Sequence, residues 1–110
     1  MIIVTILRHS DNAIAGFEIS GHAQYAKHGE DIVCAGVSAV TVGTVNSIEE
    51  LTGVVMDSEM KHGFLDAHLP SHVEPEAQEQ VQLLLASMVV MLTSIECSYG
   101  KYIKIQNVII

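Results

Sequence analysis

The apolar and polar positions of the first 20 residues are typical of two strands that bury one face. Residues 2–8 are rich in β-branched side chains, and residues 13–20 divide between two faces with a period of two. The cluster His9-Ser10-Asp11-Asn12 between them is typical of a turn. These segments predict a hairpin. The face expected to be buried carries Ala13, Ala15, Phe17 and Ile19.

Two longer stretches place apolar side chains three or four residues apart, which is the spacing of a helix face. The first predicts a helix from about residue 35 to residue 51 or 52, with Gly53 as its C-terminal stop. The second predicts a helix from Pro75, a residue suited to a first turn, to Gly100. Its apolar stripe consists of Ala77, Val81, Leu84, Leu85, Met88, Met91, Leu92 and Ile95.

The remaining segments predict a second hairpin and a last strand. Residues 54–60 and 64–69 flank the turn Lys61-His62-Gly63, and Pro70 ends the hairpin because proline cannot donate to a strand ladder. Residues 102–110 predict a strand with Ile103, Ile105 and Ile109 on one face. The element order ββαββαβ predicts an α+β fold, in which two helices cover one face of a five-stranded antiparallel or mixed sheet.

The composition fits a single domain spanning residues 1–110, since 49% of the side chains are hydrophobic. Thirteen acidic and five basic side chains give a formal charge of −8, which argues against direct nucleic-acid binding and suits a basic partner. The apolar stretch from Leu83 to Leu92 is too short to span a bilayer. The apolar N-terminus lacks the basic region and cleavage site of a signal peptide, so we expect a cytoplasmic protein.

The candidate chemistry lies between residues 21 and 38, where a histidine and a cysteine flank a polar loop. His22 ends the second predicted strand, and Cys34 stands just before the first predicted helix. A cysteine is a nucleophile when it is a thiolate, and both an imidazolium and a helix N-terminus favour that form. The alternative is that Cys34 is a small buried apolar side chain, which is the usual state of a free cysteine.

Two motifs in this segment are specific. They are Gly21-His22-Ala23 and, after a spacer ending in Gly29, Asp31-Ile32-Val33-Cys34-Ala35 followed by Val37-Ser38. Together they resemble the ribosomal-processing cysteine protease Prp family, whose length and element order also fit. The resemblance implies a cysteine endopeptidase with a His22–Cys34 dyad, in which the histidine takes the thiol proton and returns a proton to the leaving amine.

The resemblance also implies a substrate and an assembly. The substrate would be the short N-terminal extension of a large-subunit ribosomal protein, cut after an aromatic residue as part of ribosome maturation. Similar proteins are homodimers, so we expect a homodimer here.

Five further residues of the motifs are candidates for supporting or substrate-binding roles. Asp31 is expected to cap the helix or fix the loop, or else to orient the histidine. Backbone N–H groups of residues such as Ala35 and Gly36 could hold the oxyanion of a tetrahedral intermediate. Ser38, one helical turn beyond the cysteine, lies near the site or serves as a packing residue. Gly21 permits close backbone approach or a turn. Gly36 departs from the family pattern, in which we expect alanine at this position.

The sequence leaves two other functions open. The chain could bind a ribosomal component without catalysis, or Cys34 could be a redox or metal residue with His22 and His28 as ligands. The spacing of Cys34 and Cys97 matches no zinc motif and no disulfide framework, which weakens the second alternative. We therefore expect no cofactor and no metal, a solvated His28, and an inert packing role for Cys97.

Overall fold

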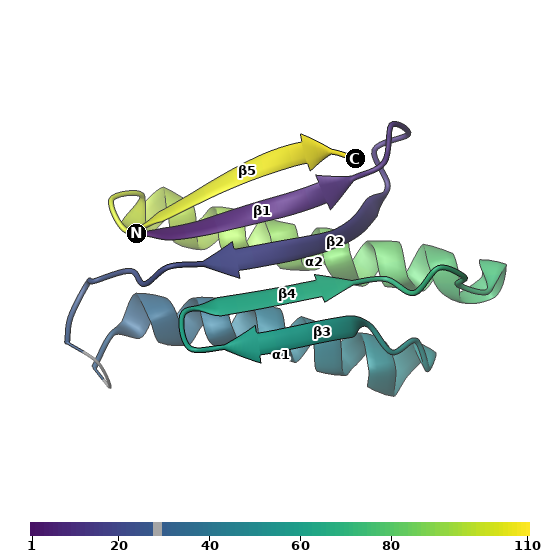
Figure 1. Ribbon diagram of the computed structural model, residues 1–110, viewed down its shortest axis with the longest axis horizontal. Coiled ribbons are helices and arrows are strands. Elements are labelled where there is room, and N and C mark those ends of the chain that lie inside the picture. The colour runs from purple at the N-terminus through teal and green to yellow at the C-terminus, as the bar shows by residue number, and fades with distance from the viewer. Residues whose placement is uncertain (28–29) are drawn as a thin grey trace.

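The computed structural model describes residues 1–27 and 30–110, and it places five strands in one sheet with two helices behind it (Figure 1). The strands are β1 (Ile2–Arg8), β2 (Ile14–Ser20), β3 (Asp57–Lys61), β4 (Phe64–His68) and β5 (Ile103–Ile109). The helices are α1 (Ile32–Thr52) and α2 (Pro75–Tyr99). The predicted element order and α+β class are confirmed.

The sheet has the strand order β3-β4-β2-β1-β5 and is mixed. Its neighbouring strands are antiparallel except β1 and β5, which run parallel from the pair Ile2–Ile103 onward. The parallel pair arises because α2 carries the chain back to the end of the molecule where β1 begins (Figure 1). The same end holds the start of α1 and the β3–β4 turn.

A β-bulge changes the buried face of the first hairpin. Leu7 pairs with Gly16 and Arg8 pairs with Ile14, so Ala15 stands unpaired between them. An extra residue in one strand reverses its alternation at that point. Ile14 is therefore buried on the same face as Phe17, and the predicted burial of Ala13 and Ala15 on that face is wrong.

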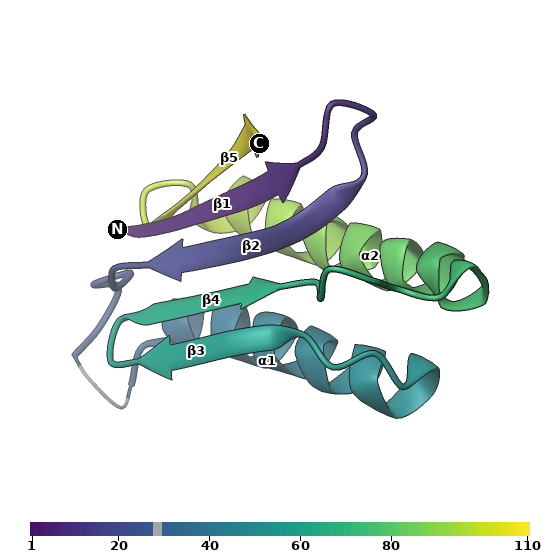
Figure 2. The ribbon, with the colours of Figure 1, turned by 45° about the vertical axis from the view of Figure 1, so that its right-hand side comes forward.

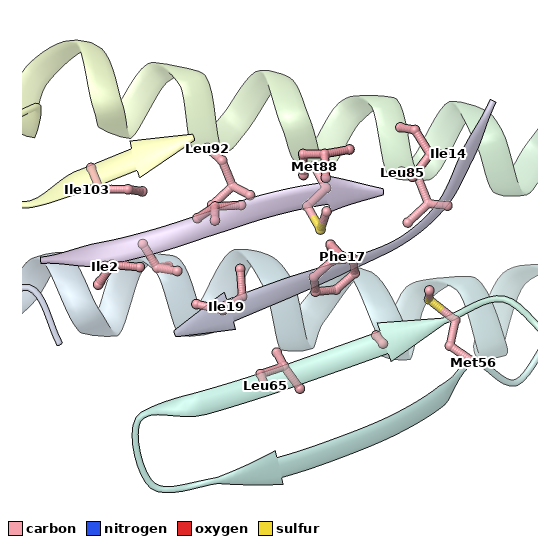
Figure 3. Packing of buried hydrophobic residues seen from close by; sticks show 14 of the residues in the cluster. Ile2, Ile14, Phe17, Ile19, Met56, Leu65, Leu85, Met88, Leu92 and Ile103 are labelled. Carbon is pink, nitrogen blue, oxygen red and sulfur yellow. The ribbon is translucent and has the colours of Figure 1, made fainter. Parts of the chain in front are cut away.

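The core fills the space between the sheet and the two helices (Figure 3). Four residues of the predicted α2 stripe are buried, namely Val81, Leu85, Met88 and Leu92, whereas Met91 is 41% exposed. The α1 helix contributes the buried threonines Thr41 and Thr44, whose hydroxyls donate to backbone carbonyls one turn earlier in the helix. Thr41 and Thr44 are the only buried polar side chains of α1 among the described residues, and these bonds satisfy their hydroxyls.

Two elements begin three residues away from their predicted starts. The α1 helix begins at Ile32 rather than near residue 35, because Asp31 caps it. It ends as predicted at Gly53, whose φ of 77° is left-handed and whose N–H donates to the carbonyl of Glu49. The β3 strand begins at Asp57 rather than at residue 54, because Met56 turns into the core instead of continuing the ladder.

Both helices are long and apolar enough to cross a membrane by length and composition, with mean hydropathies of 1.4 for α1 and 1.7 for α2. The expectation from the sequence rested only on residues 83–92, a stretch that Ser87 interrupts. Core helices of folded domains pass the same test. Figure 2 shows both helices lying against one face of the sheet, where their buried side chains join the common core.

Candidate active site

A groove of about 710 Å³ opens where β2 ends, the β3–β4 hairpin turns and α1 begins. His22, Cys34 and Ser38 line it, together with Gly63 of the hairpin turn. Three elements that are separate in the sequence thus bring the predicted histidine and cysteine to one cavity. A second cavity of about 570 Å³ lies between the end of α1 and the start of α2, and its described lining contains none of the predicted site residues.

Cys34 is half-buried in the first turn of α1, as the third residue of the helix. The prediction placed it just outside the helix. Its sulfur accepts the backbone N–H of Ala23 at 3.3 Å, and its own N–H donates to the carboxylate of Asp31 at 3.0 Å. The sulfur thus lies beside an N–H donor and at the positive end of the helix dipole, which are surroundings expected of a cysteine nucleophile.

Asp31 joins the helix to the loop through both oxygens of its carboxylate. Oδ1 accepts the N–H groups of Val33 and Cys34 at 3.0 Å each, and Oδ2 accepts those of Tyr25 at 2.9 Å and Ala26 at 3.4 Å. Desolvation acts to raise the pKa of Asp31. The four backbone donors, Cys34 foremost, outweigh it and hold that pKa below its usual value. The predicted capping and loop-fixing role is confirmed.

An aromatic cluster holds the loop on its other side. The ring of Tyr25 meets the rings of Tyr99 and Tyr102 edge-on, with centroid distances of 5.7 Å and 5.1 Å. Edge-to-face packing of this kind is favourable because the ring edge is positive and the ring face negative. The loop is therefore attached both to the start of α1 and to the junction of α2 with β5. His28 and Gly29 lie outside the described residues, so the prediction for His28 stays a prediction.

The imidazole of His22 faces the β3–β4 turn. Its centroid lies 4.8 Å from that of His62, with the two ring planes at 45°. Among the described residues, no hydrogen bond joins His22 to the sulfur of Cys34. The sulfur instead accepts the N–H of Ala23, the residue directly after His22. The bond between a nucleophile and its base is often long before substrate binds, so this arrangement is compatible with a dyad.

Three of the other predicted residues also line the groove. A Cβ on Gly21, whose φ is 86°, would strike the carbonyl oxygen of Met1, so this glycine serves both the turn and the close backbone approach. Ser38 is exposed one turn beyond Cys34. Ala35 lines the groove too, but its N–H donates to the backbone carbonyl of Asp31 at 3.1 Å. The predicted oxyanion donor at Ala35 is therefore wrong, because the helix already uses it.

Gly36 faces the second helix. A Cβ built on it would lie 3.7 Å from Cδ1 of Ile95, which is an ordinary van der Waals contact. The described lining of the groove does not include Gly36. Its position indicates helix–helix packing rather than the substrate-binding role that the sequence suggested.

Sequence reasoning missed two residues beside the histidine and misjudged one cysteine. His62 and Gly63 were assigned only to a turn, and the turn itself carries no signal of a site. The pairing of β2 with β4 brings it beside His22, and that pairing could not be deduced from the sequence. Cys97 is exposed, so its predicted packing role is wrong. Within residues 1–27 and 30–110, no three His, Cys, Asp or Glu side chains form a metal site.

Comparisons with known proteins give matches over nearly the whole chain. A family model described as cysteine protease Prp matches residues 1–104. The chain is 40% identical to the ribosomal processing cysteine protease Prp of Bacillus subtilis (strain 168), with all of both chains covered. It is 35% identical to the protein of the same name from Staphylococcus aureus (strain Mu50 / ATCC 700699), over 96% of this chain and 97% of that one.

Two solved structures share the fold over nearly the whole chain. Both are of an essential ribosomal processing protease Prp from S. aureus. One is in complex with a covalently linked product peptide; its TM-score is 0.87 at 34% identity, with 98% of this chain and 100% of that chain covered. The other is in complex with a substrate peptide, with a TM-score of 0.84 at 31% identity and the same coverage. The present chain therefore belongs to the cysteine protease Prp family.

Proposed function

We propose that the protein is a cysteine endopeptidase that removes the short N-terminal extension of a large-subunit ribosomal protein, cutting after an aromatic residue. Its relatives are named ribosomal processing cysteine proteases, and two related structures hold peptides. The observation that carries the proposal is the position of Cys34. Its sulfur lies at the start of α1, accepts the N–H of Ala23 and shares the groove with His22.

The two side chains divide the chemistry between them. His22 takes the thiol proton of Cys34, and the thiolate attacks the carbonyl carbon of the scissile peptide bond. The tetrahedral intermediate collapses as the imidazolium gives its proton to the leaving amine, which leaves the substrate acyl group on sulfur as a thioester. Water, deprotonated by His22, then hydrolyses the thioester and restores the thiol. Because the Nε2 edge of the ring lies against the β3–β4 turn, we assign the proton transfer with the sulfur to Nδ1.

The setting and the assembly are part of the same proposal. Ribosomal proteins are made in the cytoplasm, so we place the enzyme there, where thiols stay reduced. The formal charge of −8 suits a basic ribosomal substrate. Exposed apolar side chains on α2, with Leu83 at 71% and Val90 at 66%, suit the buried face of a homodimer. Light scattering after size-exclusion chromatography measures the mass, and a mass of 11.9 kDa would contradict the dimer.

The test uses the ribosomal protein that carries its extension. Wild type should release the extension by a single cut, detected by intact-mass spectrometry, whereas Cys34→Ala and His22→Ala should release none in the same time. Cys97→Ala is the matched control, because it removes an exposed cysteine outside the groove and should cleave like wild type. Full cleavage by Cys34→Ala would end the proposal.

The same experiment addresses the non-catalytic alternative. If wild type leaves the extended protein intact but binds it, and Cys34→Ala binds equally well, the protein is a ribosome-associated binding protein. Peptide mapping after alkylation gives a second criterion. Cys34 should react faster than Cys97 at pH 7, since the proposed function makes it the nucleophile.

A further inference from the structure

We propose that Gly63, in the β3–β4 turn, is a positioning residue for the imidazole of His22; this inference rests on the proposed role of His22 as the base. A Cβ built on Gly63 would come within 2.7 Å of Nε2 and within 3.4 Å of both Cδ2 and Cε1. The ring therefore occupies the space that any side chain at position 63 would fill. The bare Cα is the surface against which the imidazole rests.

The backbone holds the histidine to the same residue. The N–H of Gly21 donates to the carbonyl of Gly63 at 2.9 Å, which extends the β2–β4 ladder one step beyond the pair Ser20–Phe64. Gly63 thus fixes the chain just before His22 through its carbonyl, and it receives the tip of the His22 ring against its Cα. One residue, Gly63, therefore contacts both the backbone next to His22 and the tip of its ring.

His62 bounds the same imidazole on another side. Its ring lies 4.8 Å from the ring of His22, centroid to centroid. The imidazole is therefore bounded by an aromatic ring from one residue of the turn and by the Cα of the next. Gly63 also has a φ of 74°, which side chains disfavour, so both the backbone and the space beside His22 favour glycine here.

The geometry predicts what an added methyl group does. The atom that must move is the tip of a side chain rather than backbone, so a Cβ at position 63 displaces the imidazole and leaves the hairpin folded. A misplacement of about 1 Å between reacting groups costs on the order of a hundredfold in rate. The rest of the groove lining, Ser38 for example, is untouched. The loss should therefore fall on kcat rather than on KM.

Gly53 supplies a matched control within the same chain. Its φ of 77° is nearly that of Gly63, so an alanine is equally strained at either position. A Cβ on Gly53, however, meets nothing within 4 Å, and Gly53 ends α1 far from the groove. The comparison of Gly63→Ala with Gly53→Ala cancels the backbone strain and isolates the contact with His22.

The experiment measures kcat and KM on a fluorogenic peptide spanning the extension, and records the ring resonances of His22 by NMR, assigned with His22→Gln. Gly63→Ala should lower kcat by about tenfold to a hundredfold and shift the His22 resonances, with KM within about threefold of wild type. Gly53→Ala should leave kcat and the His22 resonances unchanged, while its Tm falls by a similar amount. Gly63→Asn should match Gly63→Ala, because asparagine tolerates a left-handed backbone yet still carries a Cβ.

The result that overturns the inference is a Gly63→Ala protein whose kcat and His22 resonances equal those of Gly53→Ala. If Gly63→Ala fails to fold, the asparagine variant decides by the same two readouts. Failure of the proposed function looks different, because His22→Gln would then cleave like wild type. In that case only the shift of the His22 ring resonances in Gly63→Ala tests whether Gly63 positions the imidazole.

Discussion

Substitution of Asp31 separates the two structural roles of its carboxylate. Oδ1 caps α1, and Oδ2 holds the loop at Tyr25 and Ala26. Asp31→Ala removes both roles. Asp31→Asn keeps an oxygen for the cap, since asparagine caps helices as well as aspartate, but it can present an NH2 group where Oδ2 accepted from the loop. The asparagine variant therefore releases the loop alone.

The magnitudes follow from the two sets of bonds. Loss of an N-cap side chain costs about 1 kcal/mol. Of the two loop bonds, the one at 2.9 Å is exposed and the one at 3.4 Å is part-buried and long, so together they contribute about 1 kcal/mol. We expect Asp31→Ala to lose about 2 kcal/mol of unfolding free energy and Asp31→Asn about half of that. Each kcal/mol lowers Tm by about 4 °C in a chain of this size.

The pH dependence has a definite sign. The folded-state pKa of Asp31 is held below its usual value of 3.8, so its charge stabilises the native state above that value. The stability is lost as the pH falls from 3.8 through the lower folded-state pKa. A protonated Asp31 resembles asparagine, so the difference between wild type and Asp31→Asn should shrink toward zero on acidification from pH 7.

Urea unfolding followed by circular dichroism at pH 7 and at pH 3 measures these differences. The reasoning is refuted if Asp31→Asn is as unstable as Asp31→Ala at pH 7, since the cap would then not be separable from the loop. It is equally refuted if the advantage of wild type over Asp31→Asn grows on acidification.

Three further predictions concern packing. Gly36→Ala should raise Tm by about 4 °C, since alanine gains about 1 kcal/mol in a helix and its methyl group meets Ile95 at van der Waals distance; a lower Tm in calorimetry contradicts this. Leu85→Ala should cost about 2–5 kcal/mol in urea unfolding because Leu85 is fully buried, and a cost below 1 kcal/mol argues against the described core. Tyr25→Ala should speed hydrogen exchange at Ala23, and Tyr25→Phe should restore protection because the ring contacts need no hydroxyl; equal exchange in both variants contradicts the anchoring.

Local periodicity was sufficient to predict most of the fold. The α2 helix from Pro75, the end of α1 at Gly53 and the first strand follow from patterns of a few residues, and the structure places them there. The errors arise where a contact distant in sequence or a backbone irregularity decides. The bulge at Ala15 depends on the register with β1, and the burial of Met56 depends on the finished core.

The site was predictable as far as its motifs reach. Asp31 and Cys34 are neighbours in the chain, so a capping role could be deduced from spacing alone. The contact of the His22 ring with Gly63 could not be deduced in this way. Gly63 lies 41 residues away and meets His22 through the β2–β4 pairing. The oxyanion role of Ala35 failed because the helix starts earlier than its apolar pattern, which commits that N–H to Asp31.

Trapping the acyl-enzyme tests most directly whether the sulfur of Cys34 attacks the substrate. The wild-type protein is mixed with a peptide ester of the extension, quenched in acid within milliseconds, and weighed intact, and the label is located by peptide mapping. The dyad predicts a mass increase equal to the acyl fragment, attached to Cys34 as a thioester, and its absence in Cys34→Ala. Cleavage without any such adduct, or an adduct on another residue, would contradict it.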